Sequence, residues 1–403
     1  MFGFININAN AWQVLYRTNA GNTSTPMATV TTIIVPTYPR DDRLIMHAAI
    51  EDASAYKCRP SKTLRKELLP DAGSLIERIE LLFLGTYLQQ GWVVSVADYE
   101  GPMSAFGAGP IAGYSTLDAA RATLNFKESG LDRKKTKIGS VGYSGGAIAV
   151  GWAAQLQGSY APELNIAGWA LGGTPANISD VVEKADQKFT AGLIVLGAAG
   201  VLAGYPELAP VAEKYLTPKG HAAVDYVRHN CAILASAPFA FDHIQSKKYI
   251  KGGLQLSEVP GVNKKIADLT MGANGLTPKA PVFMFHAVTD EFIPYAATKD
   301  AAQTWCDQGA QIEFTTEVLG LEHIATYIAT FSRVFRFLED RFQDKPLKYR
   351  KCSFKTIATP ALNPIDDLEL GGHVLEVAKT LLGLATGNPI KSEIIKAHSN
   401  NSF

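Results

Sequence analysis

The stretch KIGSVGYSGGAIAVGWAA, residues 137–154, joins a strand pattern to a helix pattern through a tight turn. Residues 137–142 form a short, mostly apolar run, and residues 147–154 are rich in helix-forming alanine. The turn between them reads Gly142-Tyr143-Ser144-Gly145-Gly146. Small residues two positions before and after the serine let strand and helix pass closely, so the hydroxyl is raised above the sheet edge. We therefore predict that Ser144 is a nucleophile, whereas Ser140 lies inside the strand.

Strand and helix patterns alternate on both sides of this turn. Further strands are expected at residues 12–17, 31–36, 92–98, 166–171, 281–288 and 311–319. Helices are expected at residues 74–90, 116–129, 147–156, 296–308 and 324–342. This alternation is typical of a mostly parallel sheet with helices on both faces. With the serine turn, it predicts an α/β fold of the α/β-hydrolase type.

The alternation is interrupted once. From Pro175 to about Pro278 the chain is helical in pattern and has no obvious strand, and the strand pattern resumes at Pro281. We therefore expect a hydrolase core of residues 1–174 and 279–345, with a helical cap, or lid, inserted at 175–278. Residues 346–403 are expected to form an extension packed on the core, with one helical pattern at 374–384.

A serine nucleophile needs a base, and the base needs an acid that orients it. In this fold class they follow in the order serine, acid, histidine, each in a loop after a strand. Asp290 follows the strand pattern that begins at Pro281, with Glu291 as the alternative acid. His323 follows the pattern that ends at residue 319. The predicted triad is therefore Ser144, Asp290 and His323; His286 is placed within a strand as a core histidine.

Acyl transfer also requires donors for the developing oxyanion. The backbone N–H of Gly145, directly after the nucleophile, is the expected first donor. The turn after the strand ending at Ala97 is the expected source of the second. We predict the N–H of Asp98, with that of Tyr99 as the alternative.

Composition excludes some other classes. Hydrophobic residues make up 47% and charged residues 19%, which favours a folded domain over a disordered chain. Lys+Arg and Asp+Glu both number 38, so net charge gives no reason to expect nucleic acid as a partner. Residues 1–10, MFGFININAN, have neither a basic start nor a long apolar run, so no signal peptide is expected there.

The cysteines contain no C-x-x-C pair, which argues against a zinc ribbon or a thioredoxin-type site. Their spacing is compatible with two disulfides in any of three connectivities, and equally with free buried thiols. The four are Cys58, Cys231, Cys306 and Cys352. N-x-[ST] sequons at Asn22, Asn177 and Asn400 are potential glycosylation sites.

Several stretches resemble the fungal secretory lipases of the Candida antarctica lipase A type. They are ADYEGPMSAFGAG at 97–109, GYSGGAIA at 142–149 running on to GWAA at 151–154, YAPELNIAG at 160–168, GGTPAN at 172–177 and AWQVLYRT at 11–18. The resemblance implies a hydrolase core with a helical cap, a secreted protein, and a Ser144–Asp290–His323 triad. It supports Asp98 and Gly145 as oxyanion donors, and it suggests the pairing Cys58–Cys231 and Cys306–Cys352.

The function expected is therefore hydrolysis of carboxylic esters without metal or cofactor. The enzyme expected is a triacylglycerol lipase or a broad carboxylesterase. Its expected partners are lipid or small esters and a lipid–water interface. Alternatives are a dedicated esterase or deacetylase for a fungal metabolite, and a non-catalytic hydrolase fold used for binding. The apolar stretch 189–205 is expected to line an acyl tunnel, to face a lipid surface, or to form ordinary cap core. A monomer is expected.

Overall fold

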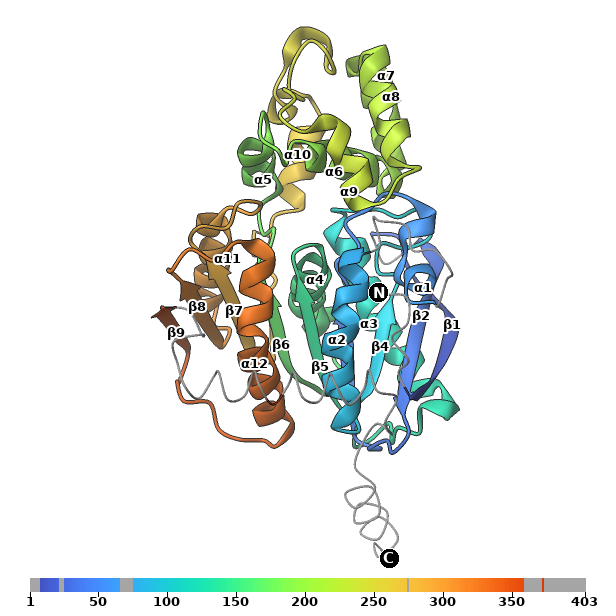
Figure 1. The fold of residues 1–403 in the computed structure, drawn as a ribbon, viewed down its shortest axis with the longest axis vertical. Coiled ribbons are helices and arrows are strands. Elements are labelled where there is room, and N and C mark those ends of the chain that lie inside the picture. The colour runs from blue at the N-terminus through green and yellow to red at the C-terminus, as the bar shows by residue number, and fades with distance from the viewer. Residues whose placement is uncertain (1–7, 22–24, 66–74, 274, 359–371, 373–403) are drawn as a thin grey trace, which may run out of the picture.

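A single mixed sheet organises the part of the chain that the computed structural model describes, residues 8–21, 25–65, 75–273, 275–358 and 372. Its strand order is β1-β2-β4-β3-β5-β6-β7-β8-β9 (Figure 1). The strands are β1 Ala9–Asn19, β2 Pro26–Pro36, β3 Arg43–Ala48, β4 Val93–Ala97, β5 Lys137–Tyr143, β6 Ile166–Gly172, β7 Val282–Ala287, β8 Ile312–Glu317 and β9 Cys352–Ile357. β2 pairs antiparallel with β1 and β4, and the remaining pairs are parallel. The predicted mostly parallel sheet is confirmed.

Two strands were missed by the sequence analysis, β3 and β9. β3 has six residues, and so short an apolar run cannot be assigned to strand or helix by periodicity. β9 is a partly exposed edge strand in which Ser353, Lys355 and Thr356 are polar, so its sequence does not alternate regularly between apolar and polar residues. It pairs with β8 from Ile312 opposite Cys352 onward. The sheet therefore extends beyond residue 345, where we had expected the core to end.

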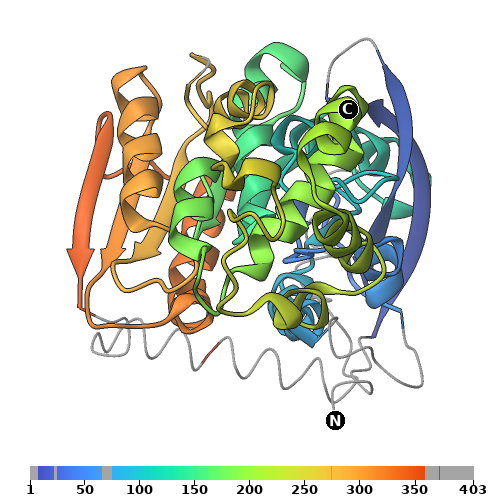
Figure 2. The same ribbon diagram turned by 90° about the horizontal axis from the view of Figure 1, so that it is seen from above.

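Helices cover both faces of the sheet (Figure 2). α2 Leu75–Gln89 and α12 His323–Phe342 pack on one face. α3 Gly109–Asn125, α4 Gly145–Tyr160 and α11 Tyr295–Asp307 pack on the other, and the short α1 spans Pro60–Thr63. The buried residues of α12 recur every three to four positions, as in Tyr327, Phe331, Val334, Phe335 and Leu338. This spacing places them on one stripe of the helix, which faces the sheet.

A group of helices lies over the carboxyl ends of the parallel strands (Figure 1). They are α5 Ile178–Ala185, α6 Gly192–Gly204, α7 Ala209–Tyr215, α8 Pro218–Val227, α9 Ala232–Ser236 and α10 Val262–Asp268. We call residues 178–268 the cap. The cap buries an apolar cluster of its own, which includes Leu196, Val227 and Tyr249. Part of its stability is therefore independent of contact with the sheet.

The apolar stretch at 189–205 becomes α6 and its flanks. Across the described ranges, no helix alone has the length and apolar character to cross a membrane. Gly192–Gly204 and Pro206–Tyr215 meet those criteria only when taken together, and they are bent by 111°. Asn177, the asparagine of a predicted sequon, caps α5 by accepting from the Ser179 N–H at 3.0 Å. The other two sequon asparagines, Asn22 and Asn400, lie outside the described residues. The predicted helical pattern at 374–384 also lies outside them.

Two disulfides join separate parts of the chain. Cys58, in the segment after β3, is bonded to Cys231 just before α9 in the cap. Cys306 at the end of α11 is bonded to Cys352 at the start of β9. This is the pairing that the resemblance suggested. The first closes a loop of 173 residues and ties the cap to the core.

Candidate active site

Ser144 occupies the turn between β5 and α4. Its backbone has φ 54° and ψ −122°, a sparsely populated conformation for a residue other than glycine, which costs about 1–3 kcal/mol. Two hydrogen bonds hold it: the Ser144 N–H donates to Gly172 O at 3.0 Å, and the Ala147 N–H donates to Ser144 O at 2.9 Å. The predicted strand–turn–helix context of the serine is thus present.

The glycines of this turn are required by close backbone approach. A Cβ on Gly142 would lie 2.3 Å from Gly146 O, and one on Gly146 would lie 2.1 Å from Ala48 O. Neither position has room for a side chain, because its neighbours are backbone atoms. Tyr143, between them, is buried and donates through its hydroxyl to His323 O at 2.6 Å. The turn is thereby tied to the loop that carries the predicted base.

Asp290 and His323 come together after neighbouring strands. Asp290 follows β7, and His323, after β8, is the first residue of α12. His323 Nδ1 lies 2.6 Å from Asp290 Oδ2, and Asp290 Oδ1 accepts from the N–H groups of Phe292 and Ile293 at 2.9 and 2.7 Å. His323 Nε2 is buried and, within the residues that the structure describes, has no hydrogen-bond partner. That nitrogen is free to act on a neighbouring hydroxyl.

The Asp290 carboxyl is stabilised in its charged form. Burial raises its pKa, but the hydrogen bonds from the His286 and His323 imidazoles outweigh burial and hold this pKa well below its ordinary range. Because the ionised carboxylate accepts a hydrogen bond from His323 Nδ1, the imidazole proton stays on Nδ1 and Nε2 is the basic atom. Glu291, the alternative acid, instead accepts from the backbone N–H of His323 at 2.8 Å. Of the two carboxylates, Asp290 is the one hydrogen-bonded to the imidazole.

The cap contacts the loop that carries this acid. Lys184 of α5 donates through Nζ to the backbone carbonyls of Asp290 and Ile293. Phe189, between α5 and α6, packs edge-on against Phe292 with ring centroids 5.3 Å apart. The acid loop is therefore braced from the cap as well as from the sheet.

The predicted second oxyanion donor, Asp98, is wrong. Its N–H donates to Val30 O at 2.8 Å, and its carboxylate accepts from the N–H and hydroxyl of Ser61 at 2.8 and 2.6 Å. The alternative donor, the N–H of Tyr99, belongs to the same turn after β4; the Tyr99 hydroxyl donates to Ala49 O at 2.8 Å. The error follows from the missed strand, because β3 rather than β4 lies beside β5. The loop after β3 is therefore the one that reaches the serine.

Asp52, which the sequence analysis did not single out, lies in that loop. It lines the same cavity as Ser144, Gly145 and His323. A Cβ on Gly145 would meet Asp52 Oδ1 at 1.8 Å, so this carboxyl lies directly against the turn. Burial raises the Asp52 pKa to about 6, although the His323 imidazole and the backbone amides of Gly145 and Asp52 favour the charged form. Within the described residues Asp52 Oδ1 is buried without a hydrogen-bond partner, directly beside the serine turn.

A buried carboxylate from α2 supports this loop. Glu80 accepts from the Ile50 N–H at 2.7 Å, and His47 Nε2 lies 3.2 Å from its other oxygen. The Tyr327 hydroxyl donates to that same oxygen at 3.4 Å, and the Tyr327 ring stacks on Tyr143 with centroids 4.4 Å apart. The loop after β3 is therefore connected to the serine turn through polar and aromatic contacts.

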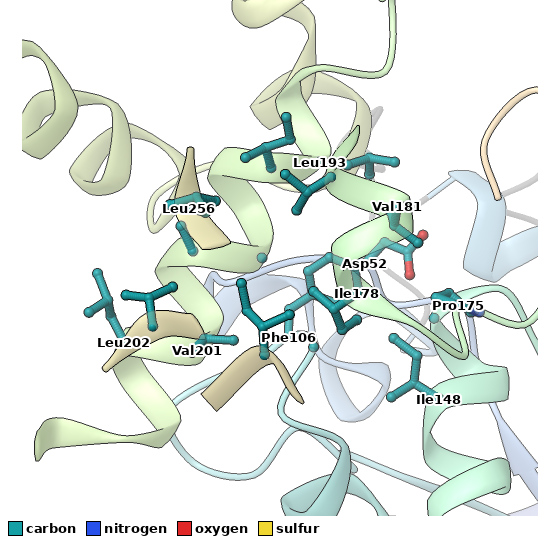
Figure 3. Close-up of a pocket in the computed structure, with 18 of the residues that line it drawn as sticks. Asp52, Phe106, Ile148, Pro175, Ile178, Val181, Leu193, Val201, Leu202 and Leu256 are labelled. Atoms are coloured by element: carbon teal, nitrogen blue, oxygen red, sulfur yellow. The ribbon is translucent and has the colours of Figure 1, made fainter. Parts of the chain in front are cut away.

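A cavity of about 220 Å³ joins these groups to the cap. Ser144, Gly145 and His323 are among its lining residues. Figure 3 shows Asp52 together with apolar side chains that line the rest, such as Ile178 and Leu193. Those from the cap include Ile178, Val181, Val182, Leu193, Val201, Leu202, Leu208, Val211, Leu256 and Val259. Such a lining suits an apolar chain extending from a reacting carbonyl.

The sequence and the fold match known proteins. Residues 69–349 match the family model of the secretory lipases. The chain belongs to the secretory lipase family. It is 41% identical to the secreted triacylglycerol lipase LIP3 of Malassezia restricta, across 83% of this chain and 72% of that protein. It is 37% identical to the secreted triacylglycerol lipase LIP1 of Malassezia furfur, across 93% and 76%.

A crystal structure of Candida antarctica lipase A superposes on this secretory lipase with a TM-score of 0.83 and 27% identity, covering 96% of this chain and 91% of that one. The predicted α/β-hydrolase fold and the predicted class, a carboxylic ester hydrolase, are both confirmed by these relatives. The relatives are named as secreted, and disulfides persist in oxidising surroundings. The enzyme is accordingly assigned to the secreted lipases.

Proposed function

We propose that this secretory lipase hydrolyses triacylglycerols, with Ser144, His323 and Asp290 as its triad and residues 175–278 as an inserted domain whose helices, the cap at 178–268, cover the site. The observation that carries this proposal is an apolar cavity that begins at Ser144 and His323 and continues between the cap helices. A long acyl chain gains free energy by leaving water for such a lining, about 0.8 kcal/mol per buried CH₂. A small polar ester would gain little from it.

The mechanism is acyl transfer in two steps. His323 Nε2 removes the hydroxyl proton of Ser144 as the oxygen attacks the ester carbonyl. Asp290 accepts from Nδ1–H and stabilises the imidazolium that forms. The amide of Gly145 and a donor from the Asp52 loop bind the oxyanion, and His323 then protonates the departing alcohol. Water, activated by the same imidazole, cleaves the acyl-enzyme and restores Ser144.

The decisive experiment compares substrates of increasing acyl length. We expect hydrolysis of p-nitrophenyl esters from acetate to palmitate to favour medium and long chains, and release of fatty acid from emulsified triolein. A preference for acetate with no activity on triolein would overturn the lipase proposal and favour a metabolite deacetylase. No hydrolysis of any ester by folded protein would favour a non-catalytic binding role.

Gly197 offers a test of the cavity as the acyl site. It lies on α6 and lines the cavity, and a Cβ there would have nothing within 4 Å. Replacing Gly197 with leucine is expected to lower kcat/KM for palmitate at least about tenfold relative to butyrate, because one side chain in an apolar pocket is worth about 1–3 kcal/mol of discrimination. Gly197→Ala is the matched control and should change the ratio little. An unchanged chain-length profile for the leucine variant would place the acyl chain elsewhere.

Asp52 offers a test of the oxyanion site. Replacing Asp52 with alanine is expected to lower kcat about 10²-fold, the order of effect of losing one oxyanion donor. The reason is that residue 52 lies against Gly145 with a positive φ of 39°, a conformation that aspartate tolerates better than alanine. Asp98→Asn is the control and should retain kcat when both variants are measured with p-nitrophenyl butyrate. An unchanged kcat in folded Asp52→Ala would argue against the loop after β3 as the source of the second donor.

A further inference from the structure

His286, the fifth residue of β7, is fully buried directly behind the predicted catalytic acid. Its Nε2 lies 3.2 Å from Asp290 Oδ2 and 3.4 Å from Ile293 O. The sequence placed this histidine in the core of a strand, without a role. Its position against Asp290 gives it one.

The surroundings of His286 fix which nitrogen carries the proton. Both atoms that face Nε2, a carboxylate oxygen and a carbonyl oxygen, are acceptors. Nε2 is therefore protonated and donates, since a bare nitrogen facing two oxygens would be repelled by both. Nδ1 is buried and has no hydrogen-bond partner in the described part of the chain. The Tyr295 ring packs edge-on against the imidazole at 6.0 Å and limits its rotation.

Asp290 Oδ2 consequently lies within reach of two imidazoles, His323 Nδ1 at 2.6 Å and His286 Nε2 at 3.2 Å. Its other oxygen is held by the amides of Phe292 and Ile293. The carboxylate therefore has donors on both oxygens, which fixes its rotation about χ2. Without His286, only the imidazole that must shuttle the proton would orient Oδ2.

We propose that His286 is a positioning residue for ester hydrolysis, acting through Asp290. By donating to Oδ2, it holds the carboxylate in the plane of the His323 imidazole and supports its charged form. This keeps the His323 proton on Nδ1 and leaves Nε2 available to Ser144. The inference rests on the proposed triad, but it goes beyond that triad by adding a fourth side chain to the acid–base chain.

The test compares His286→Leu, which removes the donor at similar volume, with His286→Gln, whose side-chain amide can still donate to Oδ2. With p-nitrophenyl butyrate as substrate, we expect His286→Leu to lower kcat about 10- to 100-fold, as is typical when an outer partner of a functional histidine–carboxylate pair is lost. KM should stay within about twofold, because His286 does not line the cavity. His286→Gln should recover most of kcat. Thr315→Val, a buried change on neighbouring β8, is the matched control and should leave kcat unchanged.

A second readout separates positioning from packing. The proton in the 2.6 Å bond between His323 Nδ1 and Asp290 Oδ2 should give a strongly downfield proton resonance. This resonance should move or broaden in His286→Leu, return in His286→Gln, and stay unchanged in Thr315→Val. Should His286→Leu fail to fold, His286→Met supplies a second variant without a donor.

Two results would overturn the inference: an unchanged kcat and resonance in folded His286→Leu, or equal impairment in the leucine and glutamine variants, which would indicate packing alone. Failure of the proposed function is distinguishable, because the unmodified protein would then release no fatty acid from triolein, whereas the His286 comparison needs only hydrolysis of p-nitrophenyl butyrate.

Discussion

Replacing Ser144 with alanine is expected to lower kcat for p-nitrophenyl butyrate by about 10⁶-fold, the order of loss when a serine hydrolase loses its nucleophile. The backbone of residue 144 and the oxyanion donors would remain, so a small residual rate above the uncatalysed reaction should persist. Release of nitrophenol by purified protein, followed by absorbance, measures the loss. Thermal unfolding of the variant checks that the fold is retained. The backbone strain at residue 144, with φ 54°, should persist in the variant, because alanine adopts that conformation no more readily than serine.

Ser140 supplies the control for this variant. It is buried in β5, and its hydroxyl donates to Met46 O at 3.2 Å within the sheet. Ser140→Ala should cost about 1 kcal/mol of stability from the lost hydrogen bond and leave kcat nearly unchanged. A kcat for Ser144→Ala close to that of the unmodified protein would remove Ser144 as the nucleophile, and a loss of about 10⁶-fold in folded Ser140→Ala would point to Ser140 instead.

Replacing Asp290 with asparagine is expected to lower kcat by about 10⁴-fold while leaving the geometry nearly intact. The reason is the tautomer of His323. An asparagine amide facing Nδ1 donates a proton where the carboxylate accepted one, so the imidazole proton moves to Nε2 and the base is lost. Because the charged carboxylate is favoured by its imidazole donors, the effect should be present across neutral pH. Steady-state kinetics between about pH 6 and 9 would measure this loss of kcat, since an ordinary carboxyl is ionised throughout that range.

Glu291→Gln is the matched control for this second variant. The glutamine can still accept from the His323 backbone N–H, which Glu291 Oε2 accepts at 2.8 Å. A loss below about tenfold is expected, because no proton transfer passes through this side chain. A larger loss for Glu291→Gln than for Asp290→Asn would make Glu291 the catalytic acid.

Local chemistry in the sequence was enough to predict the serine turn and its partners. A Cβ at position 142 or 146 would lie 2.3 or 2.1 Å from a backbone oxygen, so only glycine fits at these two positions. The placement of Asp290 and His323 in loops after strands followed from the alternation of strands and helices, which depends on residues near each other in the chain. The assignment of these residues to a triad stays a prediction until the variants are measured.

The second oxyanion donor could not be predicted in this way. Which loop reaches Ser144 depends on which strand lies beside β5, and strand order is a property of the assembled sheet. Without β3, the strand that ends at Ala97 would lie beside β5, which is why Asp98 was predicted as the donor. In the structure the Asp98 N–H is already paired with Val30 O at 2.8 Å. Asp52 became visible only when β3 was placed between β4 and β5.

At residues 137–154 the sequence by itself determined the strand, the turn and the helix, because the patterns that indicate them lie within a few residues of one another. The tertiary structure decided what surrounds Ser144: Asp52 from the β3 loop, Glu80 from α2, His286 beneath Asp290, and the cap residues that line the cavity. These groups are far apart in the chain, and only the packing of the sheet, helices and cap brings them within a few ångströms of one another.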